Sequence, residues 1–449
     1  MKSLKTNIYF KVAAIVIIGL ILLIPAAMIE DMIYERESIQ KDAIYEVSSK
    51  WANEQTISGP FITIPFFKHI NQLPNTDSLK NFSTYQQFIH VLPSELNISG
   101  TINPERRYRG IYEIVVYNSV LKISGKFQKP NFASAGIPQE DVMLNNAVFT
   151  VGIDDLRGIE KQIGLKWNMD EFNFNPGVES NDIVTTGINT KIVLDSATSE
   201  YNFAFNIILK GSQKLYFTPV GKVTDINIKS SWTNPSFNGA FLPDKRSISA
   251  NGFNANWNVL HLNRNYPQSW IGNNHKINES SFGIDLILPV DNYQKSMRTA
   301  KYVILFIGFT FLTFFFIEVL NKIFIHPVQY ILVGIALIVF FTLLLSISEQ
   351  TNFNLAFIVS AIATILLITG YVRAILKSTQ LSMLLSSILI LLYTFIFVII
   401  QLQDLALMIG SIGIFLILAI VMYFSRKIDW YNISMVEKKE ELNQTKNER

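Results

Sequence analysis

Residues Tyr302–Leu320 read YVILFIGFTFLTFFFIEVL, and four more apolar segments follow them with only short polar breaks. These are Val328–Ile347, Leu355–Tyr371, Met383–Ile400 and Leu405–Phe424, and a sixth segment, Val12–Ile29, lies near the N-terminus. Each has roughly the 17–25 residues that cross about 30 Å of hydrocarbon as a helix. Their apolar runs are continuous rather than alternating, which excludes strands of a membrane barrel. The sequence therefore predicts six transmembrane helices, one N-terminal and five C-terminal.

The composition agrees with a membrane protein. Of the 449 residues 16% are charged and the mean hydropathy is +0.27, whereas soluble domains average about 25% charged residues. Without cysteine, the chain has no disulfides and no thiolate metal ligands. Residues 30–297 carry 24 Lys and Arg against 27 Asp and Glu, so this region has no basic footprint for nucleic acid.

The basic residues of the short loops predict the orientation in the membrane. Lys2, Lys5 and Lys11 precede the first span. The breaks that alternate with it on the same side contain Lys322, then Arg373 and Lys377, and finally Arg426 and Lys427, whereas breaks 348–354 and 401–404 have no basic residue. Both termini are therefore expected in the cytoplasm, and residues 30–297 outside it.

We expect five regions along the chain. Residues 1–29 form the N-terminus and first span, 30–58 an amphipathic stem helix ended by Gly59-Pro60, and 59–297 a β-rich domain. Residues 298–427 form a five-helix transmembrane domain and 428–449 a cytoplasmic tail. A signal peptide cleaved after Ala27 is the alternative for the first span. A partner-binding helix is the alternative for the stem.

From Phe61 onward the apolar period changes from 3.6 to 2. About ten alternating runs with turn clusters between them predict an antiparallel sandwich or a partly closed barrel. One strand carries Phe203 and Phe205 on one face. We interpret these aromatic side chains as core, with a lipid-accommodating groove as the alternative.

Motifs for chemistry are absent from the sequence. The five histidines are scattered without metal-ligand spacing, and no phosphate-binding, dinucleotide-binding or nucleophile-elbow motif occurs. We therefore expect no cofactor, no metal and no enzymatic activity. Glu318 is an acid inside an apolar run and thus a functional candidate, although an ion pair with Lys322 would also explain it. Arg264, in the segment Leu262–Pro267, is either part of a polar site or a loop residue that packs on aromatic neighbours.

Several segments resemble the CreD family of bacterial inner-membrane proteins. They are Leu23–Pro25, Ile33–Arg36, Glu46–Ser48, Trp51, Gly59-Pro60, Ile64-Pro65, Asp154–Gly158, Asn263–Gln268, Leu288–Tyr302, His326–Gly334 and Ser346–Glu349. The resemblance implies a multi-pass protein of the bacterial inner membrane with residues 30–297 in the periplasm. It also implies a role in cell-envelope integrity and the envelope-stress response. The family supplies no catalytic residues to carry over.

We therefore predict a non-catalytic inner-membrane protein whose outer domain is a sensor or interaction module. The alternative is a lipid-handling or transport protein in which Glu318 and Glu349 act on a substrate. Arg36, in a family-like segment, completes the set of candidate functional residues with Glu318, Glu349 and Arg264. The expected partners are the lipid bilayer and envelope proteins or lipids.

Overall fold

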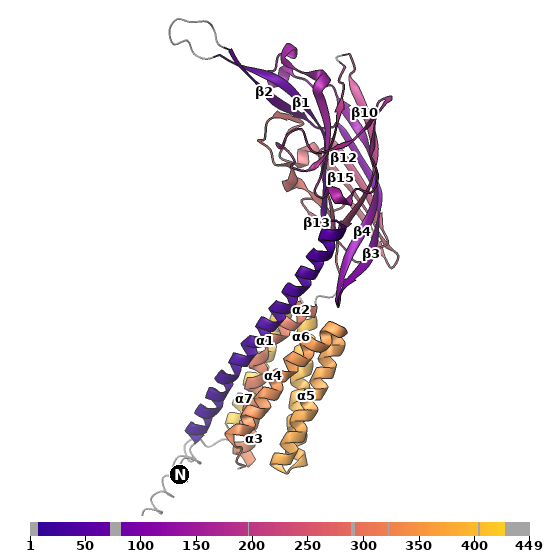
Figure 1. Ribbon diagram of the computed structural model, residues 1–449. Helices are drawn as coiled ribbons and strands as arrows, with labels where there is room; N and C mark the ends of the chain where they lie inside the picture. Colours follow the sequence, from indigo (N-terminus) through magenta and orange to yellow (C-terminus); the bar gives the residue numbers. More distant parts are fainter. Residues whose placement is uncertain are drawn as a thin grey trace, which may run out of the picture. The chain divides into compact units, whose positions relative to one another are not determined.

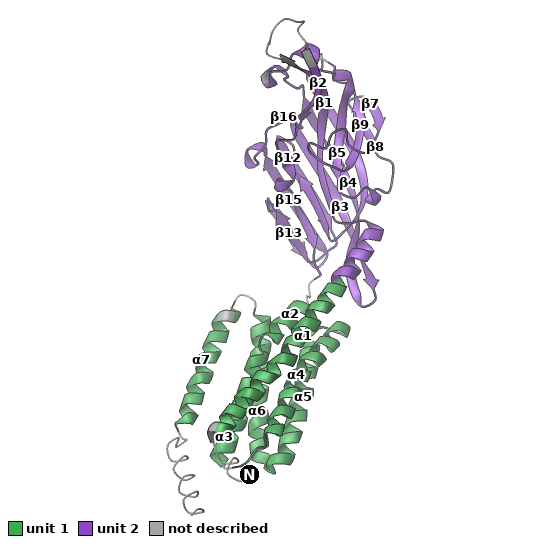
Figure 2. Cartoon of the chain, turned by 60° about the vertical axis from the view of Figure 1, so that its left-hand side comes forward, with its two compact units in different colours: residues 1–40, 290–449 green, residues 41–289 purple. Residues whose placement is uncertain are grey.

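A computed structural model of the protein describes residues 8–71, 82–195, 197–288, 292–321, 323–402 and 405–426. The chain divides into two compact units, drawn in separate colours in Figure 2. The helical unit comprises residues 1–40 and 290–449, and the β unit comprises residues 41–289. Helix α1 (Ile8–Trp51) contributes residues to both units.

The helical unit consists of the first part of α1 followed by α2–α7, whose bounds are α2 Asn292–Ala300, α3 Val303–Asn321, α4 Pro327–Gln350, α5 Phe353–Leu376, α6 Thr379–Gln401 and α7 Ala406–Ser425. Among the described residues, six helices are long and apolar enough to cross a membrane, namely α1 and α3–α7. Their exposed faces carry large apolar side chains such as Leu366 and Leu391, as expected where lipid replaces water. The prediction of one N-terminal and five C-terminal spans is confirmed.

Local sequence signals set where the helices begin. His326 caps α4: its Nδ1 accepts from the backbone N–H of Val328, and Gln329 accepts from the N–H of His326. Pro327 takes the first helical position, where its missing N–H costs nothing. Asn352 and Ser378 cap α5 and α6 by accepting from backbone N–H groups three residues on.

One stripe of α1 is buried within the helical unit. Its members recur every three or four residues and are Ile18, Leu22, Ala26, Ile29 and Ile33, which is the spacing of one helix face. At Gly334 of α4, an added Cβ would collide with the end of Leu22 and lie 3.1 Å from Cζ of Phe311. The missing side chain of Gly334 therefore allows α1 to approach α4 closely.

The β unit contains two sheets. The nine-stranded sheet has the order β13-β17-β11-β1-β5-β9-β8, with β2 pairing β1 and β16 pairing β2. Its strands are β1 Gln55–Asn71, β2 Phe82–Val91, β5 Ala147–Ile153, β8 Asn175–Pro176, β9 Gly187–Ile192, β11 Lys214–Thr218, β13 Pro235–Gly239, β16 Ser269–Ile271 and β17 Phe282–Leu286.

The eight-stranded sheet has the order β14-β15-β12-β3-β4-β10-β6-β7. Its strands are β3 Glu95–Arg109, β4 Tyr112–Gln128, β6 Gly164–Trp167, β7 Asp170–Asn173, β10 Glu200–Ser212, β12 Val223–Ser230, β14 Lys245–Ser249 and β15 Gly252–Leu260. Figure 1 shows the long strands β3, β4 and β10 side by side, in agreement with their pairing.

Both sheets are mixed and neither closes into a barrel. Most neighbours are antiparallel, but β1 pairs β11 and β12 pairs β3 in parallel. The prediction of a β-rich domain is confirmed, while its barrel alternative and its all-antiparallel pairing are wrong. The two strands of each parallel pair are far apart in the chain. A long crossover connection between them allows both strands to run in the same direction.

The aromatic side chains on β10 belong to the core. Phe203 and Phe205 are buried in a cluster that includes residues of both sheets. Phe203 lies 5.3 Å from Phe127 and 5.5 Å from Phe149, measured between ring centroids. These tilted and edge-on geometries are the ones that aromatic pairs prefer.

The stem helix ends earlier than predicted. Helix α1 stops at Trp51, and Gly59-Pro60 lies inside β1 with a cis peptide bond. At this point the register between β1 and β5 shifts between Ser58 and Phe61. The Gly-Pro pair therefore marks a strand irregularity, a role that Gly and Pro share with helix termination.

Replacing Gly334 with leucine should lower the thermal midpoint of the detergent-purified protein. Overpacking at a closed contact costs about 1–3 kcal/mol, and Leu22→Ala in the same chain should restore part of the loss. Gly370→Leu is the matched control, because an added Cβ at Gly370 meets nothing within 4 Å. Equal midpoints for the Gly334 and Gly370 variants would refute this helix contact.

Candidate functional site

Two of the four predicted candidates lie together in the helical unit. Nε of Arg36 on α1 lies 3.7 Å from Oε1 of Glu349 on α4. The hydroxyl of Tyr293 on α2 donates to the same oxygen over 3.0 Å. Glu349 is 12% exposed and Arg36 47%. This contact therefore joins α1, α2 and α4.

Glu318 lies in a second polar contact of the same unit. It is 4% exposed and forms an ion pair with Lys11 of α1. Its carboxylate also accepts from the hydroxyl of Tyr330 over 3.1 Å and from the backbone N–H of Ile325 over 2.8 Å. Its predicted partner Lys322 lies outside the described residues. Glu318 is thus held by α1, α4 and the segment between α3 and α4.

The two ion pairs involve opposite parts of α1. Lys11 and Arg36 are 25 residues apart, which at 1.5 Å per residue is about 38 Å along the helix. A bilayer has about 30 Å of hydrocarbon and about 40–45 Å including its headgroups. The spacing therefore places the charged pairs near the two boundaries of the hydrocarbon, where charge burial costs least.

Arg264 is a loop clamp in the β unit. Its guanidinium donates to the backbone oxygens of Tyr266 (2.7 Å) and Val220 (3.0 Å) and to the side chain of Gln268. Its guanidinium carbon also lies 4.1 Å from the ring centroid of Tyr266. Burial lowers the pKa of Arg264. These contacts match the loop-packing alternative for this residue.

The Asp154–Gly158 segment grips the end of α1 within the β unit. Arg157 donates to the backbone oxygen of Ser49, which belongs to the last turn of the helix. Its side chain also pairs with Asp155, with Nη2 2.6 Å and Nε 2.9 Å from the two carboxylate oxygens. The backbone N–H of Asn53 donates to Asp155. The last carbonyl groups of a helix have no donors within the helix, and a nearby cation is favourable at this end. Arg157 provides both a donor and a positive charge.

Neighbouring side chains complete this joint. Gln55, almost fully buried, exchanges hydrogen bonds with the backbone of Asp155 (2.9 and 3.1 Å). The ring of Trp51 has Lys210 4.6 Å and Arg107 4.9 Å from its centroid. The last turn of α1 therefore contacts β3 and β10 through Trp51. The sequence drew attention to this segment only through the family resemblance.

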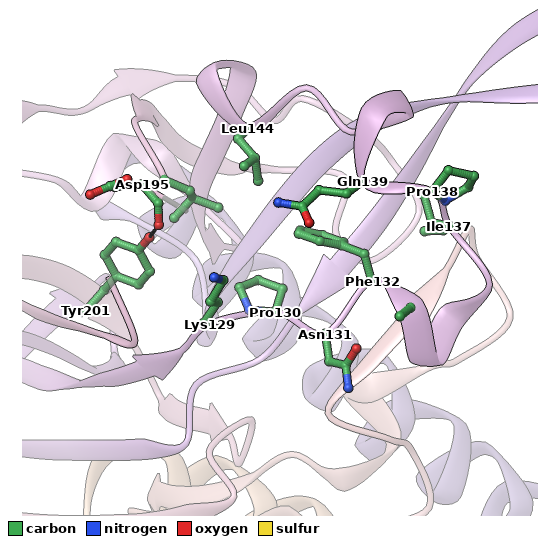
Figure 3. A pocket seen from close by; sticks show the side chains of 12 residues that line it. Lys129, Pro130, Asn131, Phe132, Ile137, Pro138, Gln139, Leu144, Asp195 and Tyr201 are labelled. Atoms are coloured by element: carbon green, nitrogen blue, oxygen red, sulfur yellow. Dashed lines mark hydrogen bonds between the residues drawn. The ribbon is translucent and has the colours of Figure 1, made fainter. Parts of the chain in front are cut away.

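A cleft of about 460 Å³ opens in the β unit beside the end of β4. It lies between the short 3-10 turns that follow β4 and the loop between β9 and β10. Figure 3 shows Phe132 and Tyr201 on opposite sides, with Lys129 and Pro130 between them. No sequence pattern indicated this cleft, because its walls come from irregular segments.

A hydroxyl, an imidazole and a carboxylate form a line in the β unit. Thr63 Oγ1 lies 3.1 Å from Nδ1 of His90, and Nε2 of His90 lies 3.0 Å from Asp182. Burial lowers the pKa of His90. Thr63 and His90 are both buried, and the ring of His90 packs against Phe61 and Trp270. Within the described residues, no group of three His, Asp or Glu side chains is arranged to hold a metal ion.

Replacing Glu318 by alanine should destabilise the protein far more than replacing Glu349. Removing one partner of a buried ion pair leaves the other charge unpaired and costs about 3–5 kcal/mol. A half-exposed pair contributes about 1 kcal/mol or less. Thermal midpoints of the two purified variants measure the difference. A Glu349→Ala variant that lost as much as Glu318→Ala would contradict this ranking.

Asp155 should make stability depend on pH below neutrality. The Arg157 hydrogen bond lowers the pKa of Asp155 to about 2 from 3.8. Because the pKa of Asp155 is lower in the folded state than in the unfolded state, its ionised carboxylate stabilises the fold at pH values above the unfolded-state pKa. This contribution, about 2 kcal/mol, is lost as the pH falls from about 4 to 2. Asp155→Asn should lose that contribution at pH 7.

Asp154 provides the control of opposite sign. Partial removal of water from its carboxyl group raises the pKa of Asp154, so its ionisation opposes folding and its contribution improves as pH falls. Asp154→Asn should therefore not lower the midpoint at pH 7. Denaturation curves at pH 7, 4 and 3 compare the two variants. Identical pH profiles would rule out the assigned role of Asp155.

Comparison with known proteins agrees with this architecture. A family model described as "Inner membrane protein CreD" matches residues 7–431. The chain is also 31% identical over 444 residues to the Inner membrane protein CreD of Escherichia coli (strain K12), covering 97% of this chain and 96% of that protein. Together with six apolar helices, these matches support a multi-pass protein of the inner membrane. The chain belongs to the CreD family, as the resemblance in its sequence predicted.

Proposed function

We propose that this protein is a non-catalytic support of cell-envelope integrity and the envelope-stress response, with the β unit as its sensor or interaction module. The observation that carries the proposal is helix α1. In the helical unit it is held by Lys11, Leu22 and Arg36, and in the β unit by its last turn. One continuous helix thus has specific contacts within each unit, and this supports a role for α1 as the link between a sensor and a membrane domain.

The basic residues that lie within the described part of the chain support the predicted orientation in the membrane. Lys11 and the α5–α6 residues Arg373 and Lys377 fall on one side by alternation of the spans, together with Arg426. The segment between α4 and α5 has no basic residue. By the positive-inside rule, residues 30–297 lie in the periplasm and both termini in the cytoplasm. Lys2, Lys5, Lys427 and the tail from residue 428 lie outside the described residues.

The burial of the Thr63–His90–Asp182 line supports a non-catalytic role. A catalytic nucleophile must be able to contact its substrate. A general base must lie within hydrogen-bonding distance of the group from which it takes a proton. Thr63 and His90 are sealed in the core of the β unit. The line is better explained as a satisfied buried polar network that fixes β1 to β2.

The contacts of Glu318 and Glu349 favour structural roles over transport. Each carboxylate is already engaged by a cation of α1 and a tyrosine hydroxyl. A substrate would have to displace these partners. The transport alternative therefore has less support than the proposed role.

Breaking α1 between the units tests the proposal. A Gly-Gly insertion after Gln40 should abolish rescue of a bacterium that lacks its own family member and is grown under cell-wall stress, because the helix would lose its stiffness and register. The same insertion after Met169, a fully exposed turn residue, is the control and should rescue. Survival is measured at matched membrane levels of each protein.

Normal rescue by the Gln40 insertion would contradict the role of α1 as a link. Failure of the unaltered chain to change survival under any envelope stress would contradict the proposed function itself.

A further inference from the structure

Helix α2 has one face buried in the helical unit. The buried side chains recur every three or four residues and are Tyr293, Ser296, Thr299 and Ala300, which is the spacing of one helix face. The helix packs on α4, α5 and α6. The side-chain amide of Asn292 donates to the backbone oxygen of Ser348 over 2.8 Å, and Nζ of Lys295 lies 3.4 Å from Oε1 of Gln401. These contacts fix which face of α2 points away from the other helices.

The exposed face of α2 carries two adjacent basic side chains. Arg298 and Lys301 are both exposed. The backbone N–H of Lys301 donates to the oxygen of Met297 over 3.2 Å, so the helical turn continues to Lys301. Side chains three residues apart on a helix are neighbours, with about 5–6 Å between their Cβ atoms. Two like charges at this spacing repel each other unless an anion lies between them.

The chain provides no such anion within the described residues, where neither basic side chain forms a hydrogen bond or an ion pair. Glu349 contacts α2 through Tyr293, on the buried face. Asp31 and Glu35, exposed acids of α1, form no ion pair with either basic residue. Asp291 lies outside the described residues. The two cations are therefore available to a group that does not belong to the described chain.

Both residues lie next to the start of a membrane span. Helix α3 begins at Val303, two residues after Lys301. Ile304 in its first turn is exposed, and an added Cβ at Gly308, one turn further along, would meet nothing within 4 Å. A phospholipid has its phosphate at this boundary and its acyl chains beside the span. The cations and the open apolar surface thus follow one another in the order of a lipid's own parts.

Basic charge at this end of the spans is concentrated on α2. Residues 292–302 contain three basic residues and no acid. Residues 348–354 and 401–404, which are at the same end by alternation of the spans, contain no Lys or Arg. Arg36 of α1 is paired with Glu349. Of the basic side chains near this boundary, Arg298 and Lys301 are thus the adjacent pair that faces outward.

We propose that Arg298 and Lys301 bind the phosphate of an anionic phospholipid whose acyl chains lie along Ile304 and Gly308. A guanidinium matches phosphate with a planar fork of donors, and an ammonium adds a compact charge. The ligand is a lipid rather than a free phosphate because the site continues directly into the apolar surface of a span. The inference goes beyond the proposed function and uses the proposed orientation only to name the leaflet, which is the periplasmic one.

Photolabelling of the purified full-length protein in phosphatidylcholine vesicles tests the site. The probe is phosphatidylglycerol with a diazirine in its headgroup, added at increasing mole fractions, and mass spectrometry locates the label. We expect label within residues 292–304 that saturates and that unlabelled phosphatidylglycerol removes. Phosphatidylcholine with the same diazirine should give neither saturation nor competition there. Absence of saturable label within residues 292–304 would overturn the proposal.

Single substitutions test the two cations. Arg298→Gln and Lys301→Gln should each raise the probe fraction for half-maximal label about fivefold, as expected for one basic residue at an anionic surface. Arg298→Lys keeps the charge and should raise it less than Arg298→Gln. The matched controls Lys122→Gln and Lys229→Gln remove exposed lysines of the β unit and should change nothing. Unaltered labelling in both glutamine variants of α2, or an equal shift in the controls, would overturn the assignment.

Two measurements separate loss of the site from loss of the fold. The thermal midpoints of the α2 variants in detergent should equal that of the unaltered protein, because the substituted side chains are exposed. Label near Arg373 and Lys377, at the opposite end of α5 by alternation of the spans, should be equal in all variants. A lowered midpoint with loss of label at both ends would assign the effect to folding and overturn the binding role.

Inorganic phosphate distinguishes a lipid from a soluble anion. Excess phosphate should remove no more label within residues 292–304 than sodium chloride of the same ionic strength does, because both act by screening. Selective removal by phosphate would assign the site to a soluble anion and overturn the lipid. None of these measurements uses survival. Saturable label with failed rescue would leave the lipid site and remove the proposed function, and rescue without such label would do the reverse.

Discussion

The ion pair between Lys11 and Glu318 is the constraint on which the helical unit depends. A carboxylate buried among membrane-spanning helices is tolerated only when a cation and hydrogen-bond donors surround it. Lys11, Tyr330 and the N–H of Ile325 meet this requirement. Because Lys11 is near the start of α1, satisfying Glu318 also determines where α1 packs. The N-terminal span is thereby part of the bundle rather than a separate anchor.

The C-terminal end of α1 is also held by charged and hydrogen-bonding groups, here in a more solvent-exposed setting. Its last carbonyl groups need donors, and Arg157 provides them while Asp155 holds the guanidinium in place. Gly158 belongs to this arrangement, because an added Cβ would press on the backbone oxygen of Lys210 and the side chain of Gln55. A short family-like segment thus holds the last turn of α1 in the β unit. Charged residues therefore contact α1 within each of the two units, Lys11 being part of the helical unit's ion pair and Arg157 part of the β unit's contact.

Much of the fold was predictable because burial away from water, or exposure to lipid, leaves simple patterns of apolar residues in a sequence. Continuous apolar runs indicated the spans, and alternation indicated strands such as β10, whose residues are buried in turn. The topology was not predictable, because the parallel pairing of β12 with β3 joins residues far apart in the chain. Strand β5 is buried along its whole length, so its burial does not alternate between the two faces. The end of α1 was misplaced because Gly59-Pro60 suits a strand irregularity as well as a helix end.

The contacts of the candidate site residues were less predictable from the sequence than the fold was. Arg36 and Glu349 were each selected from the sequence, yet nothing in it joined them, since their contact follows from how α1 packs on α4. The choice of Lys322 for Glu318 followed the i,i+4 rule of an isolated helix, whereas a bundle offers partners from other helices, here Lys11. The cleft lacks any periodic signal because turns and prolines build it. Function in this family therefore has to be sought in contacts between distant segments, where a sequence alone is least informative.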